Sequence, residues 1–414
     1  MGQGRLANTD HIQEWPTELR RIATNSHTDD SWQPIRIEMD QPSAETELND
    51  LVGNKRIHQV VDNYDEQYAE LVVSRHPQLY QATLEVKQES LKEYLTKHYM
   101  GKKSWQLGTW VYFPWSSSLV HILEKELFLE SRTIRNKDLI TAEEQEKYAG
   151  FAVGCAGMSV GSNVALSLAI SGGSQKLKIA DAAVISASNL NRIIAGVSDI
   201  GSSKSLVVAR KLYEMNPYID IECLSENITE ASVTHFFEQP WPLQAVVDEI
   251  DDLKTKILLR IEARQRHLPV IMVTDLGDDV MLDIERFDLD SSLPLFHGLV
   301  SNVEDLLTKE VTKSEWLKYA TALVGPKNAS LRMQQSLLKI GTKLVTQPQL
   351  GGTAIMSGVV AAYAVRQIAL GEKLRSGRTL ISLDKHLRVD LNTLAYHRAH
   401  KKHTKQLQRA LDAM

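Results

Sequence analysis

The stretch Gly154-Cys155-Ala156-Gly157-Met158-Ser159-Val160-Gly161-Ser162 decides the fold that we expect for this chain. It follows a short apolar run, 151–154, and leads into an apolar-periodic segment, 163–171. A strand, a glycine-containing turn and a helix in this order form a phosphate-binding turn, because glycine lets the backbone approach a phosphate and the helix N-terminus offers free N–H groups. The turn departs from the G-x-G-x-x-G pattern, since only Gly157 and Gly161 flank its tight part. It therefore indicates a nucleotide without identifying it.

The chain beyond this turn alternates between strand-like and helix-like segments. The predicted strands are 176–181, 219–224, 245–248 and 270–274, and the predicted helices are 204–215 and 253–267. A further strand, 281–287, and two helices, 329–340 and 353–370, follow. Strands and helices in alternation form a parallel sheet with right-handed crossovers. The predicted fold class is therefore α/β, a Rossmann-like, mostly parallel sheet flanked by helices.

An acidic residue, Asp181, ends the second predicted strand, 20 residues after Gly161. A carboxylate at this distance from the glycine turn is placed to bond ribose hydroxyls, and NAD fits this part of the pattern as well as ATP. Without the glycine turn before it, Asp181 could equally be an ordinary acidic residue in a turn.

Two basic residues and an acidic run distinguish between NAD and ATP as the expected ligand. Arg192 closes the segment Ser188-Asn189-Leu190-Asn191-Arg192, and Lys204 follows Gly201-Ser202-Ser203. Arginine binds phosphate oxygens through two parallel hydrogen bonds, and lysine supplies a mobile point charge. This pair suits a triphosphate better than a dinucleotide. The acidic run 248–252 follows the predicted strand 245–248, where carboxylates face the ligand crevice and suit Mg²⁺ carried by a nucleotide.

Composition excludes several classes of protein. The 414 residues carry a formal net charge of −5, which gives no electrostatic footprint for nucleic-acid binding. Two cysteines, Cys155 and Cys223, build neither a disulfide framework nor a zinc site that needs several thiolates. The start of the chain has no apolar signal segment, and the apolar stretch 353–370 contains Arg366, which favours a buried helix over a membrane span. We expect a cytoplasmic protein that binds neither nucleic acid nor a membrane.

This set of motifs resembles the ThiF/MoeB-type adenylyltransferases, the bacterial relatives of ubiquitin-activating enzymes. The resemblance rests on the glycine turn, Asp181, the segment 188–192, Gly201 with Lys204, Asn216-Pro217 and Asp251, in the family's order. It covers residues 132–371, of which 132–145 look like the family's N-terminal arginine-containing segment. The chain looks similar to a bacterial subgroup with an N-terminal extension. We therefore expect a mainly helical extension over 1–130 (an arm followed by helices at 57–76 and 84–98), an ATP-binding adenylation domain over 131–385, and a basic tail over 386–414.

The resemblance implies an ATP-dependent adenylyltransferase that activates a carboxylate as an acyl-adenylate. The substrate is the C-terminus of a small protein or peptide, or a small-molecule acid. Carried over by position, the site consists of nucleotide-binding Gly157, Gly161, Asp181 and Asn189, catalytic Arg192 and Lys204, and Asp251 for catalysis and Mg²⁺. Asp248 and Asp252 are alternatives to Asp251 for the metal. The family's N-terminal arginine corresponds to Arg135, which would act on the ATP site of the other protomer and implies a homodimer.

Some positions depart from the family pattern. Met158 and Ser159 stand where further glycines are usual, and Ile193 stands where glutamine is frequent. No C-x-x-C pair exists, so we expect no structural zinc, and no cysteine follows residue 224, so we expect no enzyme-bound thioester. A non-catalytic nucleotide-binding partner of a related subunit is the alternative function, and a dinucleotide-dependent oxidoreductase is a third.

Overall fold

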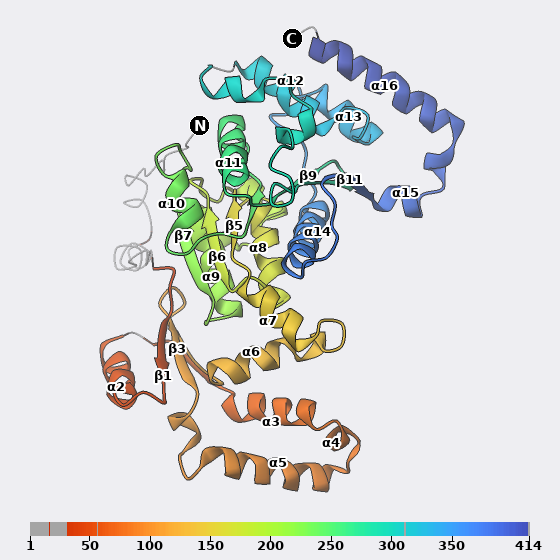
Figure 1. Cartoon of the computed structure of the whole chain (residues 1–414). Helices are drawn as coiled ribbons and strands as arrows, with labels where there is room; N and C mark the ends of the chain where they lie inside the picture. Colours follow the sequence, from red (N-terminus) through yellow and green to blue (C-terminus); the bar gives the residue numbers. More distant parts are fainter. Residues whose placement is uncertain (1–15, 17–30, 56, 310–311, 413–414) are drawn as a thin grey trace. The chain divides into compact units, whose positions relative to one another are not determined.

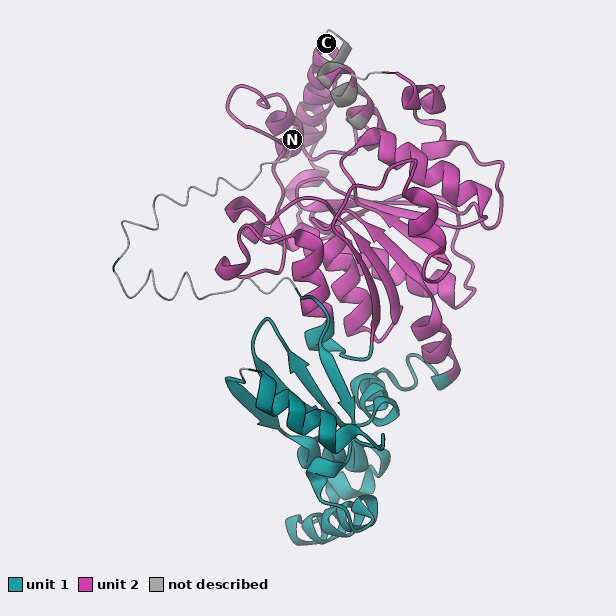
Figure 2. Cartoon of the chain, turned by 90° about the vertical axis from the view of Figure 1, so that its left-hand side faces the viewer, with its two compact units in different colours: residues 1–142, 213–218 teal, residues 143–212, 219–414 magenta. Residues whose placement is uncertain are grey.

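The computed structural model describes residues 16, 31–55, 57–309 and 312–412. The chain forms two compact units, which Figure 2 shows in different colours. One consists of residues 1–142 with 213–218, and the other of residues 143–212 with 219–414. The strongly basic segment from residue 386 onward lies in the second unit and contains the helix α16 (Leu394–Asp412).

The second unit contains a seven-stranded sheet in the order β11-β10-β9-β8-β5-β6-β7 (Figure 1). Its strands are β5 (Val153–Ala156), β6 (Lys176–Ala180), β7 (Asp220–Leu224), β8 (Ala245–Asp248), β9 (Val270–Asp275), β10 (Asp279–Glu285) and β11 (Gly377–Ser382). The first five of these strands are parallel, whereas β10 and β11 pair antiparallel at one edge. The predicted Rossmann-like, mostly parallel sheet flanked by helices is confirmed.

The helices of this unit are α7 (Ala142–Gly150), α8 (Gly161–Ile170), α9 (Lys204–Met215), α10 (Val233–Glu238), α11 (Leu253–Gln265), α12 (Lys313–Val324), α13 (Leu331–Leu337), α14 (Gly351–Ala369), α15 (Leu383–Leu387) and α16. Among them, α8, α11 and α14 contact strands of the sheet, whereas α16 contacts α12 and α13. Phe236 of α10 and Ile257 of α11 share one core cluster with Ala156 of β5. The helices α8 and α14 pack on each other so closely that a Cβ atom on Gly358 would lie 2.5 Å from the Asn163 backbone. Within the described part of the chain, no helix is both long enough and apolar enough to cross a membrane.

The first unit contains a four-stranded mixed sheet in the order β1-β3-β4-β2, beside several helices. The strands are β1 (Ile35–Glu38), β2 (Gln59–Asp62), β3 (Thr109–Phe113) and β4 (Ser118–Ile122). The helices are α2 (Ala44–Asn54), α3 (Tyr64–Arg75), α4 (Gln78–Gln81), α5 (Leu84–Tyr99) and α6 (Lys125–Thr133). The prediction of a mainly helical extension agrees with these helices, but it did not include the small sheet.

The strand β2 of this sheet was predicted as part of a helix for a local reason. Val60 and Val61 fit helical spacing with later apolar positions, but they are β-branched and pair in parallel with Leu119 and Val120 of β4. Strand pairing far along the chain therefore overrides the local periodicity, and the helix α3 begins only at Tyr64. Of the polar arm predicted over the first fifty residues, 1–15 and 17–30 lie outside the described residues.

Candidate active site

The glycine turn lies between two neighbouring strands with no room for a side chain at its centre. Gly157 has a φ of +90° and donates its N–H to the Ala180 carbonyl of β6 at 2.7 Å. A Cβ atom at this position would lie 2.3 Å from the Glu249 carbonyl oxygen, which follows β8. Glycine is therefore required here for its positive φ and for the close backbone contact. Gly161 begins α8, whose N-terminal N–H groups lie at the end of this turn.

Asp181 links the glycine turn to the loop that follows β6 by hydrogen bonds to both segments. Its Oδ2 atom accepts a hydrogen bond from the Met158 N–H at 2.7 Å, and its Oδ1 atom accepts one from the Ala183 N–H at 2.7 Å. The Lys204 ammonium, at the start of α9, lies 3.7 Å from Oδ2. The predicted contact of Asp181 to ribose remains a prediction. The structure adds a positioning role for this carboxylate in the turn.

A cavity of about 180 Å³ opens at the carboxyl ends of β8 and β9, beside the glycine turn. Three of the predicted catalytic side chains, those of Arg192, Lys204 and Asp251, line it together with Ser159 and Val160 of the turn. These residues are 59 positions apart along the chain, from 192 to 251. The crossover connections of the parallel sheet bring them to one edge, which is where open α/β sheets bind ligands.

Arg192 is held in place by neutral oxygen acceptors. Its Nε atom donates to the Ser159 Oγ atom at 3.0 Å, and its Nη1 atom donates to the Ser188 carbonyl at 3.2 Å and to Asn191 Oδ1 at 3.0 Å. Burial lowers the pKa of the guanidinium, and the negative charge of Asp251 opposes this shift. The guanidinium stays charged at physiological pH, because an arginine pKa starts far above that range.

The three aspartates that follow β8 have different environments. Asp248 is fully buried and pairs with Arg260 at 2.5 Å and with Lys256 at 3.2 Å. Asp252 caps α11, because its Oδ2 atom accepts the Thr255 N–H at 2.8 Å. Asp251 is the one of the three that lines the cavity. This arrangement supports Asp251 over its neighbours as the predicted metal ligand.

The donor set suits a magnesium ion that arrives with a nucleotide. Among the residues that the structure describes, no cluster of three or more His, Cys, Asp or Glu side chains is placed to hold a metal ion. Mg²⁺ is commonly held by one or two carboxylates together with substrate phosphates rather than by an all-protein cage. A single carboxylate beside a phosphate-binding turn fits this mode.

The cavity also contains ionisable residues that the sequence analysis missed. Lys256 and Asp275, which the sequence analysis did not name, line it together with Glu249, which belongs to the acidic run 248–252 but received no role of its own. Glu249 is buried, accepts the Val273 N–H at 2.9 Å, and has its pKa raised well above the usual range by that burial. Burial also raises the pKa of Asp275, which accepts a hydrogen bond from Ser357 Oγ of α14 at 2.6 Å. Asp275 ends a parallel strand just as Asp248 does, so the rule that pointed to the acidic run 248–252 could have found it.

Gly157, Gly161 and Asp181 neighbour this cavity without lining it, and two further predicted site residues, Asn189 and Arg135, also lie outside its lining. The Asn189 side chain is buried, and its Oδ1 atom accepts the Ser186 N–H at 3.0 Å, which shapes the turn before Arg192. Arg135 lies in the 3₁₀ turn Ile134–Asn136 of the first unit and is exposed there. Their predicted roles toward phosphate and toward a second protomer remain predictions.

Comparison with protein families agrees with this geometry. The model of the ThiF family matches residues 131–407, well over half of the chain. The chain belongs to the ThiF family. It therefore has the fold of the adenylating enzymes related to ubiquitin-activating enzymes, which is the resemblance that the motifs predict.

A curated relative extends beyond this chain. An uncharacterised protein of Mycobacterium tuberculosis is 35% identical over 274 residues, which is 66% of this chain and 38% of that protein. The chain thus spans about two fifths of the length of that relative.

Solved structures with a similar fold include three distantly related proteins. PaaA is 17% identical over 62% of this chain and 78% of its own, with a TM-score of 0.45. Escherichia coli MccB in complex with ATP is 16% identical over 58% of this chain and 63% of its own, with a TM-score of 0.42. The E. coli tRNA N6-threonylcarbamoyladenosine dehydratase is 18% identical over 58% of this chain and 95% of its own, with a TM-score of 0.42.

Proposed function

We propose that this ThiF-family protein is an ATP-dependent adenylyltransferase that activates a carboxylate. One carboxylate oxygen of the substrate attacks the α-phosphorus of ATP, the bond to the bridging oxygen of the β-phosphate breaks, and acyl-adenylate and pyrophosphate form. The observation that carries the proposal is the single cavity lined by Arg192, Lys204 and Asp251 beside a glycine turn. Such a reaction depends on neutralising phosphate charge more than on acid or base catalysis.

Each side chain has a distinct task in this reaction. Arg192 and Lys204 bind the phosphates and stabilise the charge that develops around the α-phosphorus. Asp251 holds Mg²⁺, which when bound neutralises phosphate oxygens. Asp181 and the backbone of the glycine turn bind the nucleoside end, since they lie at the carboxyl ends of β6 and β5.

The acyl group passes directly to an external acceptor in this proposal, without an enzyme-bound thioester. Burial raises the pKa of the Cys155 thiol, which is completely buried under the glycine turn. Burial also raises the pKa of Cys223 to about 11. A thiol in such surroundings stays protonated, whereas the thiolate is the nucleophile. The activated acid is the C-terminus of a small protein or peptide, or a small-molecule acid, and Arg135 acts from a second protomer.

Calorimetric titration of Mg·ATP into the wild type and into Arg192→Ala and Asp251→Ala tests this site. Loss of a charge-assisted contact costs about 1.5–3 kcal/mol, so we expect the dissociation constant to rise by roughly 10- to 100-fold. Arg398→Ala and Asp278→Ala remove exposed side chains of the same types outside the cavity and serve as matched controls. Pyrophosphate exchange with a panel of acids then tests the chemistry.

Two results would contradict the proposal. Equal ATP affinity in all five proteins would place the nucleotide elsewhere. Tight ATP binding without exchange for any acid, together with a related subunit that co-purifies, would instead support the alternative of a non-catalytic partner. The retained Arg192, Lys204 and Asp251 in one cavity favour the enzyme.

A further inference from the structure

The carboxyl group of Asp275 is buried and has one oxygen without a hydrogen bond. Asp275 ends β9, and only 4% of the residue is exposed. Its Oδ1 atom accepts a hydrogen bond from the Ser357 Oγ atom of α14 at 2.6 Å. Its Oδ2 atom has no hydrogen-bond partner among the residues that the structure describes. A buried acceptor without a donor is destabilising, so an unpaired acceptor on a residue that lines a cavity indicates a ligand that supplies the donor.

Asp275 lies on the side of the candidate active site away from the glycine turn. The turn follows β5, Asp275 ends β9, and β8 lies between these two strands in the sheet. The proposed function places the phosphates of ATP at the turn and at Arg192. The β9 side of the cavity, which Asp275 lines, is therefore left for the acid that attacks the α-phosphorus.

Arg192 and Asp275 bring opposite charges to the lining of one cavity. Burial lowers the pKa of Arg192, and the charges of Asp251 and Asp275 oppose this shift. Burial raises the pKa of Asp275, and the Ser357 hydroxyl and the charge of Arg192 oppose that shift. In the described part of the chain, Arg192 and Asp275 thus act on each other without forming a direct ion pair. A positive and a negative group held in this way match a ligand that carries both charges.

We propose that the acid activated at this site is a free α-amino acid, and that the Oδ2 atom of Asp275 accepts a hydrogen bond from its ammonium group. The inference rests on the proposed function, because it names the class of acid. An α-amino acid carries its carboxylate and its ammonium on one carbon atom, so both reach the cavity together. The carboxylate oxygen bonds to the α-phosphorus and pyrophosphate leaves, while the ammonium keeps its protons. Asp275 therefore determines specificity and transfers no proton.

The same carboxyl group discriminates against acids without an ammonium group. A cation at hydrogen-bond distance favours the ionised form of Asp275, so the two charges neutralise each other in the buried site. A plain acid instead brings a second negative charge and leaves Oδ2 unpaired. A site built to hydrogen-bond a substrate N–H rejects an analogue that lacks it by orders of magnitude, because buried polar groups are then left without partners.

Apolar side chains complete the cavity. They include Leu253, Met272 and Leu323, which are all buried. Ligand sites typically combine an apolar wall with a few polar groups that fix the orientation of the ligand. This lining favours an amino acid with an apolar side chain, whose two charged groups are oriented by Arg192 and Asp275.

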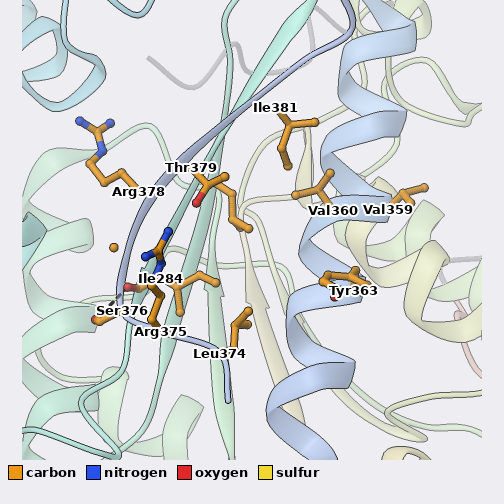
Figure 3. A pocket seen from close by; sticks show the side chains of 12 residues that line it. Ile284, Val359, Val360, Tyr363, Leu374, Arg375, Ser376, Arg378, Thr379 and Ile381 are labelled. Atoms are coloured by element: carbon orange, nitrogen blue, oxygen red, sulfur yellow. Dashed lines mark hydrogen bonds between the residues drawn. The ribbon is translucent and has the colours of Figure 1, made fainter. Parts of the chain in front are cut away.

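A larger hollow in the same unit does not match an amino acid. It has a volume of about 620 Å³ and lies between α14 and the strands β10 and β11 (Figure 3). The charged residues of its described lining are Arg375 and Arg378, and no carboxylate is among them. Two guanidinium groups repel an ammonium ion. The buried carboxylate of Asp275 thus distinguishes the smaller cavity as the site for a zwitterion.

ATP–pyrophosphate exchange by the wild type, with each standard amino acid in turn, tests this inference. Every amino acid that supports exchange is compared with its deamino acid (leucine with isocaproate, for example) and with its N-acetyl derivative, which presents the amide of a peptide C-terminus. Because Oδ2 is left unpaired or meets a neutral N–H, kcat/KM should be lower by roughly 100-fold or more for both analogues. Exchange with deamino or N-acetyl acids as fast as with the amino acids would overturn the inference.

The variant Asp275→Asn keeps the shape of the side chain and removes its charge. The KM for the amino acid should rise by roughly 10- to 100-fold, while the KM for Mg·ATP stays unchanged. Asp279→Asn is the matched control, since Asp279 is also buried, its Oδ1 atom also lacks a partner in the described structure, and it lies outside the cavity lining. An equal rise of both KM values in Asp275→Asn, or the same KM values in the two variants, would reduce Asp275 to a structural role.

Calorimetry separates this inference from the proposed function. Each amino acid is titrated into the wild type saturated with Mg²⁺ and α,β-methylene-ATP. If the nucleotide analogue binds but no amino acid does, the inference is wrong, and exchange with another acid would leave the proposed function intact. If an amino acid binds and Asp275→Asn abolishes this binding, but no nucleotide binds, the role of Asp275 stands and the proposed function fails.

Discussion

Replacing Gly351 by alanine tests whether α14 positions Arg192. Gly351 is the first residue of α14, and a Cβ atom there would lie 2.1 Å from the Asn191 carbonyl oxygen. Ordinary contact begins near 3.4 Å, so the helix and the segment 191–192 must separate by about 1.3 Å. The obstacle is backbone rather than a flexible side chain, and it cannot rotate away. Overpacking of this kind costs about 1–3 kcal/mol of folding free energy.

The neighbouring residue provides a matched control. Gly352 has nothing within 4 Å of an added Cβ atom, although it lies in the same helical turn. Gly352→Ala should therefore stabilise the protein by about 0.4–1 kcal/mol, because alanine reduces the conformational freedom of the unfolded chain. The two variants have the same composition, so the difference between them isolates the close contact with Asn191.

Two measurements compare Gly351→Ala with Gly352→Ala. In urea denaturation, Gly351→Ala should unfold at a lower midpoint than the wild type and Gly352→Ala at an equal or higher one. In calorimetry, Gly351→Ala should bind Mg·ATP at least several-fold more weakly, because Arg192 moves with Asn191, while Gly352→Ala binds as the wild type does. Equal ATP affinity in the two variants, with the stability difference present, would refute the link between α14 and the nucleotide site.

Three further predictions concern buried charges. Arg260→Met leaves the Glu285 carboxylate buried without its charged partner and leaves Asp248 with Lys256 alone, so it should lower the free energy of unfolding by about 3–5 kcal/mol in chemical denaturation. Burial lowers the pKa of Lys178 to about 8, from the ordinary lysine value of 10.5. Between these two pH values the unfolded chain binds more protons than the folded protein, so folding becomes more favourable as the pH rises. The stability of the wild type relative to Lys178→Met should therefore rise by roughly 2.5 kcal/mol between pH 7 and pH 10, and a constant difference would contradict this environment of Lys178. Because burial raises the pKa of Glu249, this cavity carboxyl ionises as the pH rises and then repels phosphate. The affinity for Mg·ATP should fall with rising pH in the wild type and fall less in Glu249→Gln. Parallel pH profiles of the two proteins would count against this role of Glu249.

Much of the second unit could be predicted from the sequence because its signals are local. The helix 204–215 and the strand 245–248 were predicted with the bounds that the structure shows. Each is a short run of clear periodicity that ends at a turn residue or at a carboxylate. The edge strand β11 (Gly377–Ser382) was missed, since its pairing with β10 depends on residues about a hundred positions earlier in the chain.

The candidate site shows the same division between local and distant signals. Arg192, Lys204 and Asp251 could be proposed because each follows a recognisable strand or turn. The environment of each side chain could not be predicted, since it depends on partners from other elements. Asp248 and Asp251 are three residues apart and both carboxylates, yet Arg260, from the middle of α11, pairs with the first and leaves the second to line the cavity.

The partners of the three cavity cations indicate which of them dominates phosphate binding. Lys204 lies 3.7 Å from Asp181, and Lys256 lies 3.2 Å from Asp248, so each ammonium already has a carboxylate beside it. Arg192 differs, because its hydrogen bonds go to hydroxyl, carbonyl and amide oxygens that carry no net charge. Neutral acceptors orient the guanidinium without cancelling its charge, whereas a carboxylate partner does both. The arrangement therefore leaves Arg192 as the strongest attraction for a polyphosphate in this cavity, with the two lysines adding smaller contributions.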